Sequence, residues 1–168
     1  MNDTIALIAN LALALSFIVG LIFGIAQVRA AARDRRERLT LETLRAFQTR
    51  EFIELLQFIN NTVLPPTLED MMKLPVSQQT NLIQLSQEME SLGILVAERL
   101  INIGLVDKTL GSFVTSAWEK YKILMMDMRE KIPDPYMAEY FQWLAERLDE
   151  RMQNKPRTPY YKAHAEMI

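Results

Sequence analysis

Residues 4–28 read TIALIANLALALSFIVGLIFGIAQV, and these 25 consecutive residues include no charged side chain. As an α-helix the segment would rise about 37 Å, more than the ~30 Å hydrocarbon core of a bilayer. A helix also satisfies its own backbone hydrogen bonds, which lipid cannot do for it. The stretch therefore predicts a transmembrane anchor over residues 1–28.

Charge around this segment predicts its orientation. Before it the chain has only Asp3 and the amino terminus, whereas five arginines follow it closely, at Arg29, Arg33, Arg35, Arg36 and Arg38. Basic residues beside a span stay in the cytoplasm. We therefore expect a single-pass protein of the inner (plasma) membrane, with the N-terminus outside, the C-terminal domain in the cytoplasm and the arginines near lipid headgroups. A cleaved signal peptide is the alternative, although the segment is long for one and has no Lys or Arg before it.

Small residues recur every four positions within the segment, at Ala12, Ser16, Gly20 and Gly24. Small side chains allow two helices in a membrane to approach closely, and Gly20 and Gly24 form a GxxxG pair. This ridge predicts packing of the span on a second copy or on another membrane protein. The alternative is that Gly and Ala are simply common in membrane spans.

The remaining chain has the composition of a globular helical domain. Residues 39–168 hold 14 basic and 18 acidic residues, so the domain lacks the positive surplus that nucleic-acid binding requires. The chain has no Cys, which excludes disulfides and thiolate chemistry. No segment alternates with period two, so we expect an all-α fold: the transmembrane helix, a basic helical stalk at 29–40, a compact bundle of about four to five helices at 41–155, and a flexible tail at 156–168.

Apolar periodicity predicts where these helices lie. We expect them over residues 29–60, 67–73, 77–103, 107–131 and 134–154. Ser77, Asp107 and Asp134 are the expected N-caps of the last three helices. Gly104 is expected to end the 77–103 helix as its C′ residue. The 77–103 helix carries apolar residues on two faces, with Ile83, Ile94 and Ile101 opposite its main stripe, so it should be the most buried.

Two stretches resemble a known family. They are SLGILVAERLINIGLVDKTLGSFVTSAWEKYK (residues 91–122) and PYMAEYFQWLAERL (residues 135–148). Together they are similar to a family of uncharacterised bacterial proteins classed as a domain of unknown function. The resemblance implies one N-terminal membrane span and a small helical domain. It implies no activity and no catalytic residue.

Few residues suggest chemistry. The single His, His164, falls in the expected tail, and no Ser–His or Cys–His pair can be assembled around a core. Glu88, Glu90 and Glu98 lie on one expected helix with Arg99, where solvated charges or ion pairs are the simpler interpretation than a carboxylate site. No glycine-rich nucleotide motif occurs, and no metal or cofactor is expected.

Two tryptophans, Trp118 and Trp143, lie at or outside the edges of their apolar stripes. Core packing is the default for them, and a partner surface is the alternative. The sequence thus favours a membrane-anchored helical interaction or scaffold module rather than an enzyme. The alternative function is a membrane-associated enzyme with an unrecognised carboxylate site, which would need Glu88, Glu98 and another acid to converge in a pocket.

Overall fold

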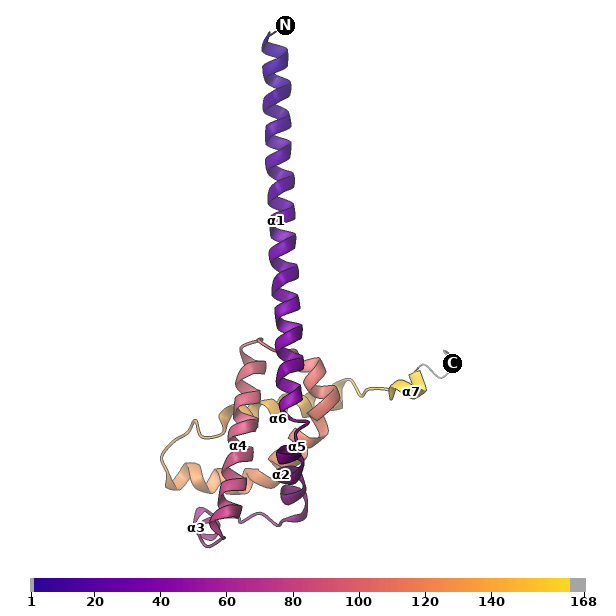
Figure 1. Cartoon of the computed structure of the whole chain (residues 1–168). Helices are drawn as coiled ribbons and strands as arrows, with labels where there is room; N and C mark the ends of the chain where they lie inside the picture. Colours follow the sequence, from indigo (N-terminus) through magenta and orange to yellow (C-terminus); the bar gives the residue numbers. More distant parts are fainter. Residues whose placement is uncertain (1, 164–168) are drawn as a thin grey trace. The chain divides into compact units, whose positions relative to one another are not determined.

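A computed structural model describes residues 2–163 of the chain. Within these residues 82% are helical and there is no strand, so the all-α prediction is confirmed. The helices are α1 (Asn2–Ala46), α2 (Arg50–Asn61), α3 (Leu68–Met72), α4 (Val76–Ala97), α5 (Ile103–Lys131), α6 (Glu139–Asn154) and α7 (Tyr160–Ala163), as Figure 1 labels them.

The chain divides into two units, Met1–Leu39 and Thr40–Ile168. The first unit consists of the apolar part of α1 and its basic continuation, and the side chains of residues 4–38 are all exposed. Among the described residues, α1 is the one helix long and apolar enough to cross a membrane by length and composition. The first unit is thus a candidate membrane span followed by a charged helical segment.

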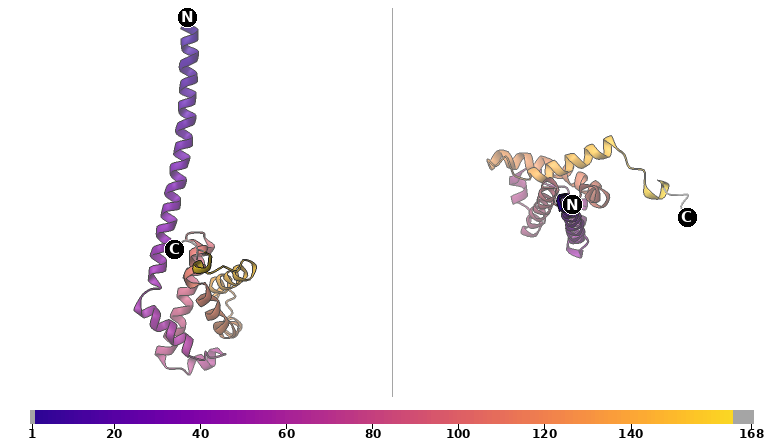
Figure 2. Two further views of the ribbon diagram at one scale, coloured as in Figure 1. Left: turned by 90° about the vertical axis from the view of Figure 1, so that its right-hand side faces the viewer. Right: turned by 90° about the horizontal axis from the view of Figure 1, so that it is seen from above.

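The second unit is a helical domain built around α4, α5 and α6. The last of these packs on both of the others, and it crosses α4 rather than running along it (Figures 1 and 2). α2 packs on α4, and α3 packs on α5. The core between them holds fully buried large side chains, among them Ile59, Leu85, Tyr121, Phe141 and Leu148.

The crossing of α4 and α6 depends on Gly93. A Cβ atom at this position would lie 2.3 Å from the backbone oxygen of Tyr140, so the two backbones meet where only glycine fits. One turn earlier on α4, the Glu90 carboxylate accepts hydrogen bonds from the N–H groups of Tyr140 and Phe141, at 3.3 and 2.8 Å. Because Ala138 provides no side-chain cap, this distant carboxylate caps the N-terminus of α6.

Side chains of α5 cap two further helix ends in the same way. The ammonium group of Lys120 donates to the carbonyl oxygens of Ile59 and Asn60 at the end of α2, at 2.8 and 2.9 Å. The carboxylate of Asp127 accepts the N–H of Leu68 at the start of α3, at 2.7 Å. This bond, more than the neighbouring Lys131, lowers the pKa of Asp127.

Buried polar groups tie the domain together at two other points. The phenol of Tyr121 donates to the carbonyl oxygen of Leu82 on α4 at 3.2 Å, and burial raises its pKa. The Thr40 hydroxyl, fully buried, accepts the N–H of Asn102 at 3.0 Å. The bond between Thr40 and Asn102 joins the first residue of the second unit to the N-cap of α5.

The prediction of one helix over residues 29–60 is wrong, because the chain turns between Ala46 and Arg50. Thr49 adopts an extended conformation there, and its hydroxyl caps α2 by accepting the N–H of Phe52 at 3.2 Å. The turn lets the rings of Phe47 and Phe52 pack edge to face, with their centroids 5.0 Å apart.

The predicted bounds of the third helix are also wrong. α4 begins at Val76 after Pro75, and Ser77 therefore lies within its first turn instead of capping it. It ends at Ala97, six residues before the expected Ile103, because Arg99 adopts the left-handed conformation at φ 58°. The N–H of Leu100 then bonds to the carbonyl oxygen of Leu95 at 2.9 Å, the arrangement that usually places Gly where Arg99 stands.

Four residues lie in environments that differ from the predicted ones. Gly104 lies in the first turn of α5, which Asn102 caps, and Asp107 is buried within that helix instead of capping it. Ile83 and Ile94 are exposed, so α4 buries one face only and the more deeply buried helix is α5.

The last long helix begins later than predicted. Asp134 does not cap it; its carboxylate accepts the N–H of Tyr136 at 3.0 Å in a turn, and α6 starts at Glu139. Arg129 of α5 fixes this turn by donating to the carbonyl oxygen of Met137 at 2.8 Å. The predicted ends of α5 at Lys131 and of α6 at Asn154 are confirmed. In the predicted flexible tail, residues 160–163 form the short exposed helix α7.

Candidate functional site

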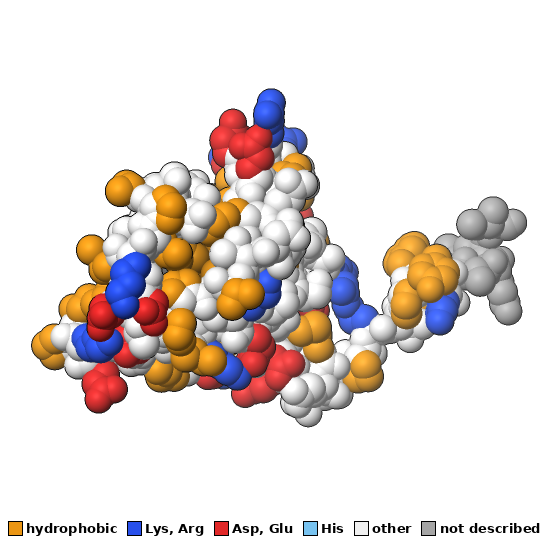
Figure 3. Space-filling model, turned by 90° about the horizontal axis from the view of Figure 1, so that it is seen from below, with side chains coloured by type: hydrophobic (Ala, Val, Ile, Leu, Met, Phe, Trp, Pro, Cys, Tyr) orange, Lys and Arg blue, Asp and Glu red, His pale blue; other side chains and the backbone are white. Residues whose placement is uncertain are grey.

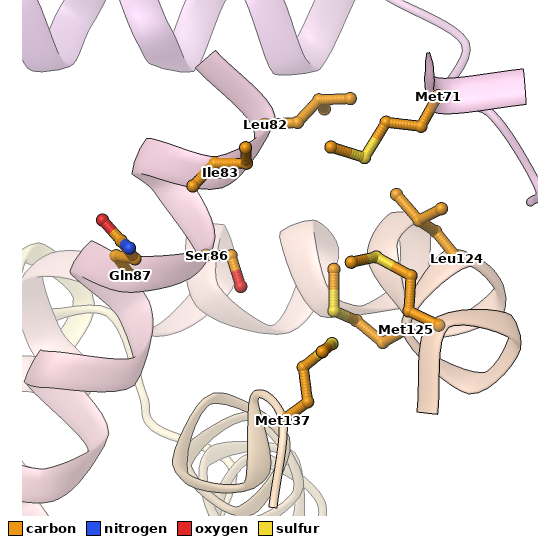
Figure 4. A pocket seen from close by; sticks show the side chains of 9 residues that line it. Met71, Leu82, Ile83, Ser86, Gln87, Leu124, Met125 and Met137 are labelled. Atoms are coloured by element: carbon orange, nitrogen blue, oxygen red, sulfur yellow. The ribbon is translucent and has the colours of Figure 1, made fainter. Parts of the chain in front are cut away.

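A methionine-lined pocket opens between α3, α4, α5 and the turn before α6. Figure 4 shows side chains of Met71, Leu82, Met125 and Met137 directed into it from these four segments. Its volume is about 230 Å³. The complete lining is Met71, Leu82, Ile83, Ser86, Gln87, Leu124, Met125, Met128 and Met137.

The pocket is apolar, and its lining includes no ionisable side chain. Ser86 and Gln87 supply the polar groups, and Ile83 stands at the opening with 47% of its surface exposed. Methionine side chains are flexible and polarisable, so a surface with four of them adapts to differently shaped apolar groups. Such a pocket can bind apolar side chains; it offers no group for acid–base or nucleophilic chemistry.

Hydrophobic side chains also reach the outer surface of the domain. Figure 3 shows them interspersed among Lys, Arg, Asp and Glu on the face seen from below. Ile123 and Met126, both on α5 and outside the pocket lining, are 60% and 50% exposed. The pocket therefore differs from the rest of the surface by its concave shape and its clustered methionines, and not by apolarity alone.

The acidic residues singled out from the sequence do not converge. Glu88 accepts a hydrogen bond from Gln84 on its own helix, at 2.9 Å, and lines an open hollow with Thr43 and Phe47. Glu90 points the other way and caps α6, whereas Glu98 is exposed at the end of α4 next to Arg99. Within residues 2–163 no group of three His, Cys, Asp or Glu side chains could hold a metal ion.

The first unit presents its predicted site residues to the surroundings. The four small residues of the ridge are exposed, and nothing lies within 4 Å of a Cβ built at Gly20 or Gly24. Arg33 pairs with Glu37 at 2.9 Å, which raises the pKa of Arg33. The other predicted headgroup contacts, at Arg29, Arg35, Arg36 and Arg38, are also exposed.

The two tryptophans lie in different environments. Trp118 is 5% exposed and packs edge to face on Phe141, with ring centroids 5.2 Å apart, so it is a core residue. Trp143 is half-buried and lines a shallow hollow with Ala97, Glu139 and Tyr140. Of the predicted pair, Trp143 alone contributes to the exposed surface. His164 lies outside the described residues.

The sequence analysis missed the pocket, although most of the lining residues fall within the helices that it predicted. Met71 belongs to no stripe, because α3 is only five residues long. The available signal was the count of ten methionines in 168 residues. Pairing Met71 with Met125 and Met137 requires the fold, since these residues are far apart in the sequence.

The architecture defines a class of protein: an all-helical domain preceded by a long apolar helix. Residues 14–148 match a family model described as a domain of unknown function (DUF4760). The chain belongs to this family, as the resemblance of residues 91–122 and 135–148 predicted. Comparisons with curated proteins and with solved structures give no match.

Proposed function

We propose that this protein is a membrane-anchored helical interaction module, which holds a partner at the cytoplasmic face of the plasma membrane. The observation that carries the proposal is the combination of a charge-free helix, exposed along residues 4–28, with a folded domain that has an open methionine-lined pocket. An apolar helix exposed in this way needs a lipid or protein environment.

The orientation in this proposal comes from charge. Arg29, Arg33 and the three further arginines up to Arg38 follow the apolar segment directly, which favours a cytoplasmic location for everything after it. Their guanidinium groups would also bind anionic headgroups, at about 1 kcal/mol each near the surface.

The proposed occupant of the pocket is the apolar face of a helix from a partner protein. Two or three apolar side chains of such a helix would enter between Met71, Met125 and Met137, and Ser86 and Gln87 would bind its polar edge. The role is binding rather than catalysis, because none of the lining side chains is ionisable.

The span would associate through its ridge in the same assembly. Ala12, Ser16, Gly20 and Gly24 leave the helix surface open along one winding stripe, and we propose that a second copy or the membrane helix of a partner packs there.

Site-specific photocrosslinking in membranes tests the pocket. A photoreactive amino acid replaces Ile83 in the full chain, and a matched variant carries it at Ile123, which is exposed on α5 outside the pocket. We expect a discrete adduct from position 83 and none from position 123. The adduct should disappear when Ser86→Glu places a charge in the pocket and persist in Ser86→Ala. Equal adducts from both positions, or an adduct that survives Ser86→Glu, would contradict the proposal.

A further inference from the structure

A second cavity, basic where the methionine-lined pocket is apolar, is formed by α5, α6 and the residues that follow α6. Its volume is about 550 Å³. Five of its side chains are cationic and two are acidic, in a chain whose net charge is −2. The charged lining residues are Lys108, Arg147, Arg151, Lys155, Arg157, Asp107 and Glu150.

The carboxylate of Asp107 lies near two arginines of the cavity but is too far from their Nε atoms for hydrogen bonds. Its side chain is only 8% exposed, and its Oδ2 atom lies 4.0 Å from Nε of Arg151 and 3.9 Å from Nε of Arg157. Both distances exceed a hydrogen bond. Its Oδ1 atom is buried and has no hydrogen-bond partner within the described chain. The carboxylate therefore attracts both guanidinium groups to the cavity while their N–H groups stay available.

The second acid is already engaged. Glu150 accepts a hydrogen bond from Arg147 at 2.6 Å across one turn of α6. Four cations then remain, Arg151, Arg157, Lys108 and Lys155, against the single carboxylate of Asp107, so the cavity keeps a net charge of +3. Cations near the end of α6 also favour its helix dipole, but that effect needs no cavity and no residue of α5.

We propose that this cavity binds a phosphoryl group. Arginine presents a planar fork of donors that matches two oxygens of a phosphate, and lysine adds a point charge beside it. Arg151 and Arg157 would take the oxygens, while Lys108 and Lys155 would neutralise the remaining charge from the rim.

A phosphoryl group could come from a lipid headgroup or from a soluble phosphate ester. The first source is compatible with the position of the cavity along the chain. Gly104 lines the cavity, and two residues before it the N–H of Asn102 bonds to Thr40, which lies shortly after the apolar segment. Thr40 follows Val28 by 12 residues of α1, which rise about 18 Å as an α-helix. This short connection is the reason that a headgroup of the same membrane is one of the two sources tested.

Calorimetric titration of the full chain in phosphatidylcholine nanodiscs tests the inference. The soluble probe is glycerol 3-phosphate, and the lipid probe is a parallel disc preparation in which phosphatidylglycerol replaces part of the phosphatidylcholine. We expect saturable binding of glycerol 3-phosphate that weakens with added salt. If phosphatidylglycerol in the disc suppresses that binding, the lipid headgroup occupies the cavity; if it does not, the cavity takes the soluble ester.

Variants separate the cavity from general charge. Arg151→Lys with Arg157→Lys keeps the charges beside Asp107, so folding is preserved, but it removes the planar forks; we expect binding about tenfold weaker or more. Lys108→Gln with Lys155→Gln leaves the buried carboxylate faced by both arginines and should weaken binding and its salt dependence. The control, Arg50→Lys, changes an exposed arginine that pairs with Glu54 on α2 and should bind as wild type does.

The absence of saturable binding in the wild type, or unchanged binding in both double variants, would overturn the inference. Its failure would leave the proposed function standing, because the photocrosslink from Ile83 reports on a different set of residues. Conversely, loss of that crosslink would not affect binding at the basic cavity.

Discussion

Gly93→Ala is the smallest change that tests how the domain is packed. The added methyl carbon would lie 2.3 Å from the carbonyl oxygen and 2.6 Å from the carbonyl carbon of Tyr140, where ordinary contact begins at 3.4 Å. Both neighbours are backbone atoms, so no side-chain rotation can relieve the clash. α4 and α6 would have to move apart by about 1 Å at their crossing.

The magnitude follows from three contributions. Overpacking a well-packed contact costs about 1–3 kcal/mol. Separation of the helices also stretches the hydrogen bonds from Tyr140 and Phe141 to Glu90, and a hydrogen bond to a charged group contributes about 1.5–3 kcal/mol. Alanine opposes these losses, since it favours a helix over glycine by about 0.8–1.0 kcal/mol. We expect a net loss of about 2–4 kcal/mol in the free energy of unfolding.

The assay is urea unfolding of the full chain in a mild detergent, followed by far-UV circular dichroism. The midpoint should fall with little change in the denaturant slope. Ser91→Ala is the matched control: Ser91 is exposed two residues away on the same helix, and its replacement should leave stability unchanged or slightly higher. A Gly93→Ala variant as stable as wild type would show that helix propensity outweighs the contact, and the described crossing would be wrong.

Three further predictions concern a cap, a titration and the span. Glu90→Ala should lower the free energy of unfolding by about 1–3 kcal/mol in the same assay, because it leaves the first N–H groups of α6 without a partner. The hydrogen bond from the Leu68 N–H lowers the pKa of Asp127 from its ordinary 3.8. This carboxylate therefore stabilises the fold above that pH, and the contribution is lost as the pH falls through the lower pKa of the folded state. Asp127→Asn should reduce the loss of stability on the acid side, below about pH 4, in urea titrations. Gly20→Ile and Gly24→Ile should each abolish the signal of a membrane dimerisation reporter, since a β-branched side chain holds the helices apart while the segment still inserts.

Each of these has an outcome that contradicts it. An unchanged unfolding midpoint for Glu90→Ala would mean that solvent caps α6 equally well. An acid transition in Asp127→Asn identical to that of the wild type would remove this carboxylate from the pH dependence. A reporter signal that is lost equally with Leu21→Ile, a volume-conserving change off the ridge, would show that the assay does not report on the small residues.

The sequence predicted the helices but not all of their ends, and the reason is physical. Periodic apolar residues identify α5 and α6 and their buried faces from the sequence alone, and the predicted C-terminal ends of both helices are correct. The start of α6 and the end of α2 are capped by Glu90 and Lys120, which lie 50 or more residues away in the sequence. At α3 the local cap Thr67 is joined by the distant Asp127. Local rules assign caps to neighbours in the chain, so they favoured Asp134 for α6 and Gly104 for the end of α4.

The candidate site was less predictable than the fold. Met71 reaches the pocket because α3 packs on α5, and Met137 because Arg129 holds the turn before α6. Neither contact leaves a periodic pattern. The basic cavity is hidden for the same reason: Asp107 resembles a helix cap in the sequence, and only packing against α6 places it between Arg151 and Arg157.

In the function that we propose, the apolar helix crosses a membrane and leaves the folded domain on the cytoplasmic side. Because the chain has no Cys, single cysteines can be introduced without background labelling. Asn2→Cys and Ser116→Cys, the latter at an exposed position of α5, are treated with a membrane-impermeant maleimide in cells whose inner membrane is intact. We expect labelling of Asn2→Cys at once and of Ser116→Cys only after permeabilisation; labelling of Ser116→Cys before permeabilisation, or of neither position, would contradict this topology.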